Sequence, residues 1–205
     1  MIELPPNHSK VAVHDIFDPL PLFMLEARCL IVDIPYNQSL LANYSNRPDV
    51  TLSHRNLGRF ADFVNRLFEC TDEISPSECF VETGREALAD IIIEIRRRFP
   101  KWTFYNSMYY GRRNNRCYVV HGSHAKRFRR LNNLDDMDEA KVIEWLCHNV
   151  DAAECVGDLC MGRGLVGWHA YRAGRRFVGT ELNPKRLAVL VDRIHKAEAK
   201  RHAQR

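Results

Sequence analysis

Short apolar runs alternate with longer amphipathic segments along most of this chain. Runs rich in Val, Ile, Leu and aromatic residues predict β-strands over 10–14, 28–33, 102–110, 117–121, 155–159 and 176–181. Apolar residues at helical spacing predict helices over 55–70, from Thr83 to about Phe99, over 137–150, from the glycine loop to about Ala173, and after Pro184. This alternation indicates an α/β fold with a mostly parallel twisted sheet and helices on both faces.

Polar and turn-forming residues indicate where these elements begin and end. Thr83, with Glu86 three residues later, has the pattern of a capping box at the start of a helix. The turn-like GRRNN between 102–110 and 117–121 predicts an antiparallel hairpin at one edge of the sheet. The segment 37–53 is polar and turn-rich and predicts a loop, and the polar chain after Lys196 predicts a frayed end.

Composition places the chain among globular proteins. Of its 205 residues, 45% are hydrophobic and 27% are charged, which suits a single domain and argues against disorder. No run approaches the roughly 20 apolar residues of a membrane span, and the N-terminus MIELPPNHSK lacks the pattern of a signal peptide. Seven irregularly spaced cysteines without a CxxC argue against a disulfide scaffold and a structural zinc site. We therefore expect a cytoplasmic protein without a membrane partner or a metal.

Charge is distributed unevenly along the chain. Residues 96–130 hold eleven Lys or Arg and no acid, and aromatic residues are interleaved among them, whereas residues 131–160 hold eight acids and one Lys. Basic side chains neutralise phosphates and aromatic rings stack on unpaired bases, so the basic stretch predicts a nucleic-acid partner. A solvated basic face beside a buried aromatic strand pair is the alternative. The candidate contacts are Arg112, Arg113, Arg116, Lys126, Arg127, Arg129 and Arg130.

A glycine loop follows the predicted strand 155–159. In DLCMGRGLVG, residues 158–167, the three glycines match GxGxxG, and Glu181 ends the next predicted strand, where a carboxylate can bind ribose hydroxyls. The tight turn alone could also explain these glycines. An NAD site needs a second nucleotide-binding half, yet only 38 residues follow Gly167. Asp158, four residues before the first glycine, suits S-adenosylmethionine better.

A second acid ends the apolar run 28–33. Asp33 is followed by Ile34, Pro35 and Tyr36, and an acid at the carboxyl end of a parallel strand faces the ligand crevice of such a sheet. An acid, backbone carbonyls and a flat ring suit a planar base with an exocyclic amino group. A strand-end acid that caps a turn beneath a packed tyrosine is the alternative.

Together these segments resemble the S-adenosylmethionine-dependent amino-group DNA methyltransferases, which make N6-methyladenine or N4-methylcytosine. The order of the motifs is similar to the permuted subgroup in which the catalytic DPPY motif precedes the cofactor loop. Residues 158–194 follow the family's DPFxGSGTT…GRRFIGIEINPE pattern, and 33–37 resemble DPPYN. Residues 141–150 resemble the helix before the cofactor loop, and His14-Asp15 resembles the family's Gly-Asp. These blocks cover roughly half of the chain.

The resemblance implies a Rossmann-like class I methyltransferase fold in one domain over 1–205, with a small insertion at 37–77 as a candidate target-recognition segment. It implies S-adenosylmethionine as cofactor and N6 of adenine in DNA as the methyl acceptor. The small arginine-rich reading surface predicts short or relaxed sequence specificity. The implied catalytic residues are Asp33, Ile34, Pro35 and Tyr36. The implied cofactor-binding residues are Asp15, Asp158, Leu159, Cys160, Met161, Gly162, Gly164, Glu181 and Asn183.

The resemblance also implies a division of roles. Asp33 and the carbonyl of Ile34 accept hydrogen bonds from the amino group, and Tyr36 stacks on the base. Asp158 and the backbone of 160–164 hold the methionine portion of the cofactor. Glu181 binds the ribose, and Asp15 lies at the edge of the adenine.

This sequence departs from the family pattern at three places. Ile34 replaces the first proline of DPPY, and Cys160, Met161 and Arg163 replace the residues around the glycines of the family pattern. The segment LDDMDE, residues 134–139, stands where the family has HPTxKP, which removes the expected contacts to the methionine carboxylate. An N4-cytosine or RNA methyltransferase and an inactive nucleic-acid-binding relative remain as alternatives. The oligomeric state is not predicted.

Overall fold

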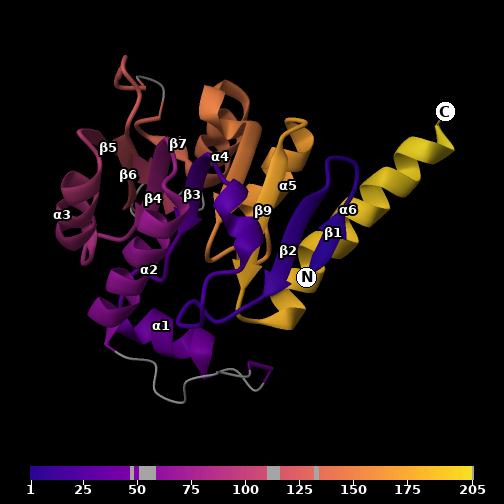
Figure 1. Ribbon diagram of the computed structural model, residues 1–205, viewed down its shortest axis with the longest axis horizontal. Helices are drawn as coiled ribbons and strands as arrows, with labels where there is room; N and C mark the ends of the chain where they lie inside the picture. The colour runs from indigo at the N-terminus through magenta and orange to yellow at the C-terminus, as the bar shows by residue number, and fades with distance from the viewer. Residues whose placement is uncertain (47–48, 51–58, 110–115, 132–133, 205) are drawn as a thin grey trace.

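The computed structural model describes residues 1–46, 49–50, 59–109, 116–131 and 134–204 (Figure 1). Its strands form one sheet in the order β1-β2-β9-β8-β3-β4-β6-β5-β7. The bounds are β1 Ile2–Leu4, β2 Ser9–Val13, β3 Cys29–Asp33, β4 Glu78–Thr83, β5 Lys101–Met108, β6 Arg116–Ser123, β7 Met137–Asp138, β8 Cys155–Asp158 and β9 Arg176–Glu181. The helices are α1 Gln38–Ser45, α2 Phe60–Ile74, α3 Leu88–Arg98, α4 Glu139–Asn149, α5 Leu165–Arg172 and α6 Pro184–Ala203.

The centre of the sheet is parallel, and antiparallel pairs flank it on both sides. Strands β2, β9, β8, β3 and β4 run in the same direction, and β6 pairs antiparallel with both β4 and β5. The predicted fold class and its antiparallel hairpin are therefore confirmed. The hairpin lies one strand inside the border, because the short β7 pairs with the outer side of β5.

Helices cover both faces of the sheet, as Figure 1 shows. Along β3, Leu30 and Val32 join the core beneath α2 and α3, while Cys29 and Ile31 join the core beneath α4, α5 and α6. Alternate residues of a strand point to opposite faces, so a strand covered on both sides is apolar throughout. This explains why the run CLIVD is continuous and why its first polar side chain, Asp33, marks the end of the strand.

The chain changes its winding direction between β8 and β3. From β3 it passes through α1 and α2 to β4 on one side, whereas from β8 it passes through α5 to β9 on the other. The two strands are parallel neighbours, with Leu30 paired to Gly157. In open α/β sheets ligands bind at the carboxyl ends of the strands where such a reversal occurs. The topology therefore places the candidate site over the ends of β3 and β8.

The prediction of a loop over 37–53 is wrong for its first part. Residues 38–45 form α1, and the side chain of Asn37 caps this helix by accepting a hydrogen bond from Leu40 N at 3.0 Å. Leu41 is buried in the core. The helix was missed because it has only two turns and weak amphipathic character, so tertiary contacts rather than local pattern hold it.

The predicted capping box at Thr83 is also wrong. Thr83 is the last residue of β4, a buried strand that the sequence analysis did not assign, and α3 begins after Ala87 without a side-chain cap. The polar residues Glu78, Glu82 and Thr83 interrupt the apolar pattern of β4, so the sequence did not indicate a strand. The fold tolerates them because each has a hydrogen-bond partner.

The predicted fraying after Lys196 is wrong as well, since α6 continues to Ala203. Glu198 accepts a hydrogen bond from the Tyr171 hydroxyl at 2.5 Å, which holds this part of α6 against α5. In the part of the chain that the structure describes, no helix has both the length and the apolar character needed to cross a membrane.

Candidate active site

Four strand ends open into one cavity of about 550 Å³. Its lining joins the segment Asp33–Tyr36 to the segment Asp158–Gly162, although more than a hundred residues separate them in the sequence. Of the residues predicted to be catalytic or cofactor-binding, the lining contains Asp15, Asp33, Ile34, Pro35, Tyr36, Asp158, Leu159, Cys160, Met161, Gly162 and Glu181. The sheet topology thus brings most of the predicted residues to a single place.

Two predicted residues lie beside the cavity and shape its frame. Gly164 is the N-cap of α5 at a φ of 78°, and a Cβ there would lie 2.5 Å from the Cβ of Leu190. Only glycine combines this backbone conformation with so close an approach of α6. Asn183 caps α6, its Oδ1 accepting a hydrogen bond from Lys185 N at 2.9 Å. These two residues position the loops that carry the lining.

The end of β8 holds a deeply buried acid. Asp158 is 1% exposed, and its Oδ1 accepts a hydrogen bond from Cys160 N at 2.9 Å. Burial raises the pKa of Asp158 to about 8, with a further upward contribution from Glu181 and an opposing one from the Cys160 N–H. A group with this pKa is available to gain or lose its proton near neutral pH when a charged ligand enters.

The loop after Asp158 is linked to the end of β9. Gly162 has a φ of 54°, and its N–H donates to Glu181 Oε2 at 2.7 Å. The other oxygen of Glu181 accepts from Asn183 N at 2.9 Å. At the neighbouring end of β2, Asp15 is buried and its Oδ1 accepts from Phe17 N at 3.1 Å. Backbone N–H groups thus fix the acids at three adjacent strand ends.

The acid at the end of β3 is presented differently. The Asp33 side chain is exposed to the cavity that it lines. Loss of hydration beside the surrounding protein raises the pKa of Asp33 well above its usual range, the carboxyl groups of Glu82 and Glu139 raise it further, and the charge of Arg186 opposes them. The next residue, Ile34, is buried in the core, which explains how an isoleucine replaces the first proline of the motif.

Tyr36 is held from three sides. Its hydroxyl donates to Glu82 Oε1 at 2.7 Å, and its ring meets Tyr109 edge-on with 5.5 Å between ring centres. A Cβ at Gly84 would lie 2.8 Å from the Cβ of Tyr36, so only glycine allows this approach. Asp33 and Glu82 are direct partners in the β3–β4 register. The segment that follows Asp33 is therefore fixed to β4.

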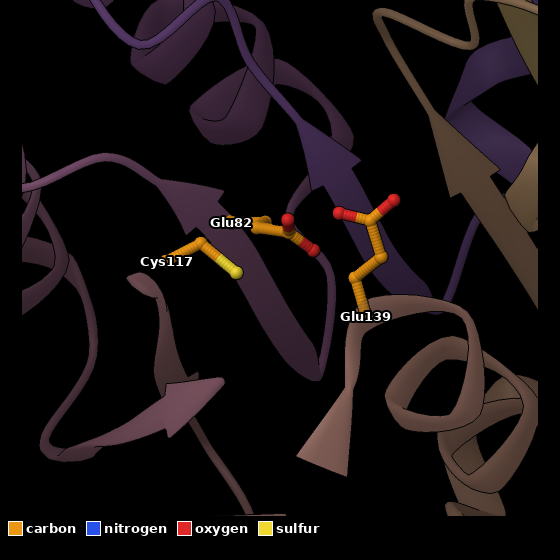
Figure 2. Close-up of side chains that lie close together, drawn as sticks. All are labelled: Glu82, Cys117 and Glu139. Atoms are coloured by element: carbon orange, nitrogen blue, oxygen red, sulfur yellow. The ribbon is translucent and has the colours of Figure 1, made fainter. Parts of the chain in front are cut away.

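Sequence reasoning missed Glu82 and its neighbours. Figure 2 shows the carboxyl groups of Glu82 and Glu139 facing each other, with the thiol of Cys117 on the other side of Glu82. All three residues are buried, and burial raises the pKa of both Glu82 and Cys117. Their candidate ligand atoms lie within 4.8 Å of one another, close enough for a metal ion. Glu82, however, already has the Tyr36 hydroxyl as a partner, and we interpret the cluster as the support of that tyrosine.

Those of the predicted nucleic-acid contacts that the structure describes are not part of the cavity lining. Arg112 and Arg113 fall outside the described residues. The exposed side chains of Arg116 and Arg130 form ion pairs with Asp136 and Asp135, at 2.5 and 2.6 Å. These pairs turn two acids of the LDDMDE segment toward arginines. Lys126, Arg127 and Arg129 are exposed.

No known family model matches this chain, and no curated protein sequence is significantly similar to it. Solved structures are similar in fold. M1.HpyAVI is 11% identical with a TM-score of 0.58, covering 90% of this chain and 98% of its own. TTHA0409 of Thermus thermophilus, solved with S-adenosyl-L-methionine, is 14% identical with a TM-score of 0.59, at 92% and 93% coverage. The cytosine-N4-specific PvuII DNA methyltransferase is 11% identical with a TM-score of 0.59, at 91% and 86% coverage. The chain therefore has the Rossmann-like fold of these proteins.

Proposed function

We propose that this protein transfers a methyl group from S-adenosylmethionine to the exocyclic amino group of a nucleobase, N6 of adenine in DNA, with short or relaxed sequence specificity. One observation carries the proposal. Asp15, Glu181, Asp158 and Asp33 follow four adjacent strands, β2, β9, β8 and β3, and line the same cavity. At a strand spacing of about 4.8 Å, this row of acids spans about 14 Å.

The row of acids matches the order of groups along the cofactor. Asp15 suits the amino edge of adenine, Glu181 suits the two ribose hydroxyls, and Asp158 suits the ammonium group of the methionine portion. This arrangement leaves the sulfonium methyl facing Asp33. The space also fits, because a Cβ at Gly162 would meet no heavy atom closer than 3.8 Å. The fold neighbour TTHA0409 was solved with this cofactor.

The residues after β3 suit the acceptor base. Asp33 and the carbonyl of Ile34 accept hydrogen bonds from the amino group and so direct the nitrogen lone pair toward the methyl group. Tyr36, fixed by Glu82, Gly84 and Tyr109, stacks on a base that has left the helix.

Positioning supplies most of the catalysis. The bound cofactor supplies an electrophilic methyl group at sulfur. As the nitrogen–carbon bond forms and the carbon–sulfur bond breaks, the nitrogen loses one proton. The carboxylate form of Asp33 is suited to take this proton, because it would already accept a hydrogen bond from the same amino group.

The polymer and the base are the finer parts of the proposal. The exposed side chains of Lys126, Arg127 and Arg129 suit a phosphate backbone, and an aspartate at the first motif position favours adenine. The helix α2, within the predicted insertion 37–77, packs on the sheet, which leaves residues before it as the candidate target reader. Cytosine N4 is the second candidate acceptor, because the PvuII enzyme of the same fold is cytosine-N4-specific.

The test is transfer of labelled methyl groups to random-sequence duplex DNA and to RNA, followed by nucleoside analysis. We expect N6-methyladenine in DNA from the wild type and about 10²- to 10³-fold slower formation from Asp33→Ala. N4-methylcytosine or methylated RNA would correct the acceptor but keep the reaction class. Binding of DNA without binding of S-adenosylmethionine would replace the proposal with a non-catalytic module. A strict six-base-pair target would contradict relaxed specificity.

A further inference from the structure

The charges lining the cavity leave one part of the proposed cofactor without a partner. Among the residues that the structure describes, five carboxyl groups line it, those of Asp15, Asp33, Glu139, Asp158 and Glu181. They suit the cationic sulfonium and ammonium groups, but they repel the methionine carboxylate. The sequence lacks the family's HPTxKP segment, so the carboxylate needs another cation.

Arg186 is a cation placed over the glycine loop. It lies in the first turn of α6, lines the cavity, and its Nη1 is 3.8 Å from the position that a Cβ of Gly162 would occupy. Its guanidinium lies over the ring of Tyr44, with 4.5 Å to the ring centre. The contact with Tyr44 of α1 therefore holds the guanidinium beside the loop after β8, where the methionine portion would lie.

The guanidinium of Arg186 is incompletely satisfied. Its Nε is buried and donates no hydrogen bond within the described residues, and the one carboxyl group on which its charge is seen to act is that of Asp33, whose pKa it lowers. A buried donor without a partner is costly unless a ligand supplies the acceptor. An arginine offers parallel N–H groups that match the two oxygens of a carboxylate.

The other cations near this end of the molecule fit the role less well. Arg163 also lines the cavity, but its side chain is exposed. Lys185, the neighbour of Arg186 on α6, is directed to Asp49 at 2.7 Å, and its side chain is 75% exposed.

We propose that Arg186 binds the carboxylate of the methionine portion of the cofactor and so replaces the contacts of the missing HPTxKP segment. The inference rests on the proposed function, since it assigns a residue to one group of the same ligand. Arg186 thus selects ligands that carry an amino acid over ligands that end at the nucleoside.

The experiment is titration calorimetry with two probes. S-adenosylhomocysteine carries the carboxylate, and 5′-methylthioadenosine lacks the whole amino acid portion beyond the thioether. Arg186→Gln is compared with the wild type, and Lys185→Gln is the matched control, because it removes one positive charge from the same helix turn.

We expect Arg186→Gln to weaken the binding of S-adenosylhomocysteine about 10- to 100-fold, the range of a charge-assisted bidentate contact. Binding of 5′-methylthioadenosine should change by less than about threefold on the same reasoning, and this probe also reports an intact adenosine pocket. Lys185→Gln should change neither.

Four results would overturn the inference. Unchanged affinity of Arg186→Gln for S-adenosylhomocysteine, or an equal loss for both probes, would reject the contact while the proposed function stands. Weaker binding of DNA with unchanged binding of both probes would assign Arg186 to a phosphate instead. Failure of the wild type to bind either probe would reject the proposed function, and the inference with it.

Discussion

Strands β8 and β3 lie side by side and both end in an aspartate, but the two acids are held in different ways. Asp158 is 1% exposed, and a backbone N–H of its own loop fixes one carboxylate oxygen. Asp33 is open to the cavity, and the rigid element at this end is Tyr36, which Glu82 holds. A fixed acid suits a ligand that binds in one position, whereas an open acid suits a base that must enter, react and leave.

This difference separates binding from chemistry at neighbouring strand ends. The β8 end should determine the affinity for the cofactor, and the β3 end should determine the rate of transfer. A substitution at one strand end should therefore change one of these two quantities, and the other quantity serves as its control.

Asp33→Ala should have the largest effect. It removes the proposed acceptor of the amino group, so the single-turnover rate should fall about 10²- to 10³-fold, as for other groups that act only in the transition state. Calorimetry should show cofactor affinity within about threefold of the wild type. Loss of affinity equal to the loss of rate would show that the two ends are not separable.

Asp158→Ala should have the next largest effect, and this effect should be on the affinity for the cofactor rather than on the transfer rate. Loss of the proposed charge-assisted contact to the ammonium group should weaken the binding of S-adenosylmethionine about 10- to 100-fold. At a saturating concentration of cofactor most of the transfer rate should return. A rate that stays low at saturation would place Asp158 in the transfer step and contradict the division of roles.

The support of Tyr36 should matter less than Asp33 itself. Tyr36→Phe keeps the ring and removes one hydrogen bond, so the transfer rate should fall about 3- to 10-fold, which corresponds to about 1 kcal/mol. Gly84→Ala pushes a methyl group against Tyr36 and should cost more than Tyr36→Phe. Cofactor affinity serves as the control in both variants, and a change there would show that the β3 end also shapes the cofactor pocket.

The smallest effect concerns stability and pH. Between about pH 4 and pH 8 the folded protein keeps a proton on Asp158 that the unfolded chain releases, so this residue lowers the free energy of unfolding as pH rises. Asp158→Asn removes this dependence and keeps the oxygen that accepts from Cys160 N. The free energy of unfolding of the variant should rise relative to that of the wild type by up to about 1.4 kcal/mol per pH unit across this window.

Urea unfolding at pH 5 and pH 8 measures the effect. We expect the advantage of the variant in the free energy of unfolding to be clearly larger at pH 8 than at pH 5. A variant whose advantage shrinks as pH rises would show that the pKa of Asp158 is not raised.

The fold was largely predictable because its centre follows simple rules. The apolar runs that became β3, β8 and β9 each end in an acid, and parallel strands covered on both faces require such runs. The strand β4 escaped prediction because its polar residues interrupt the apolar run, and two of them, Glu78 and Glu82, are satisfied by distant partners. Glu78, for example, accepts a hydrogen bond from Ser123 Oγ at 2.8 Å.

The candidate site was predictable as separate motifs but not as an assembly. Asp33 and Asp158 stood out as strand-end acids, yet only the strand order shows that they meet. The roles of Glu82 and Arg186 depend on contacts with Tyr36 and Tyr44 across the fold, and no local spacing indicates these. The one local signal was that Glu82, like Asp33, ends a mostly apolar run, and the capping pattern at Thr83 obscured it.

The most direct test of the account is a crystal structure with S-adenosylhomocysteine bound. The account predicts the adenine at Asp15, the ribose at Glu181 and the sulfur over the boundary between β8 and β3, facing Asp33. A ligand bound in the reverse direction, with its adenosine at the end of β3, would contradict the account, as would a ligand bound outside this cavity.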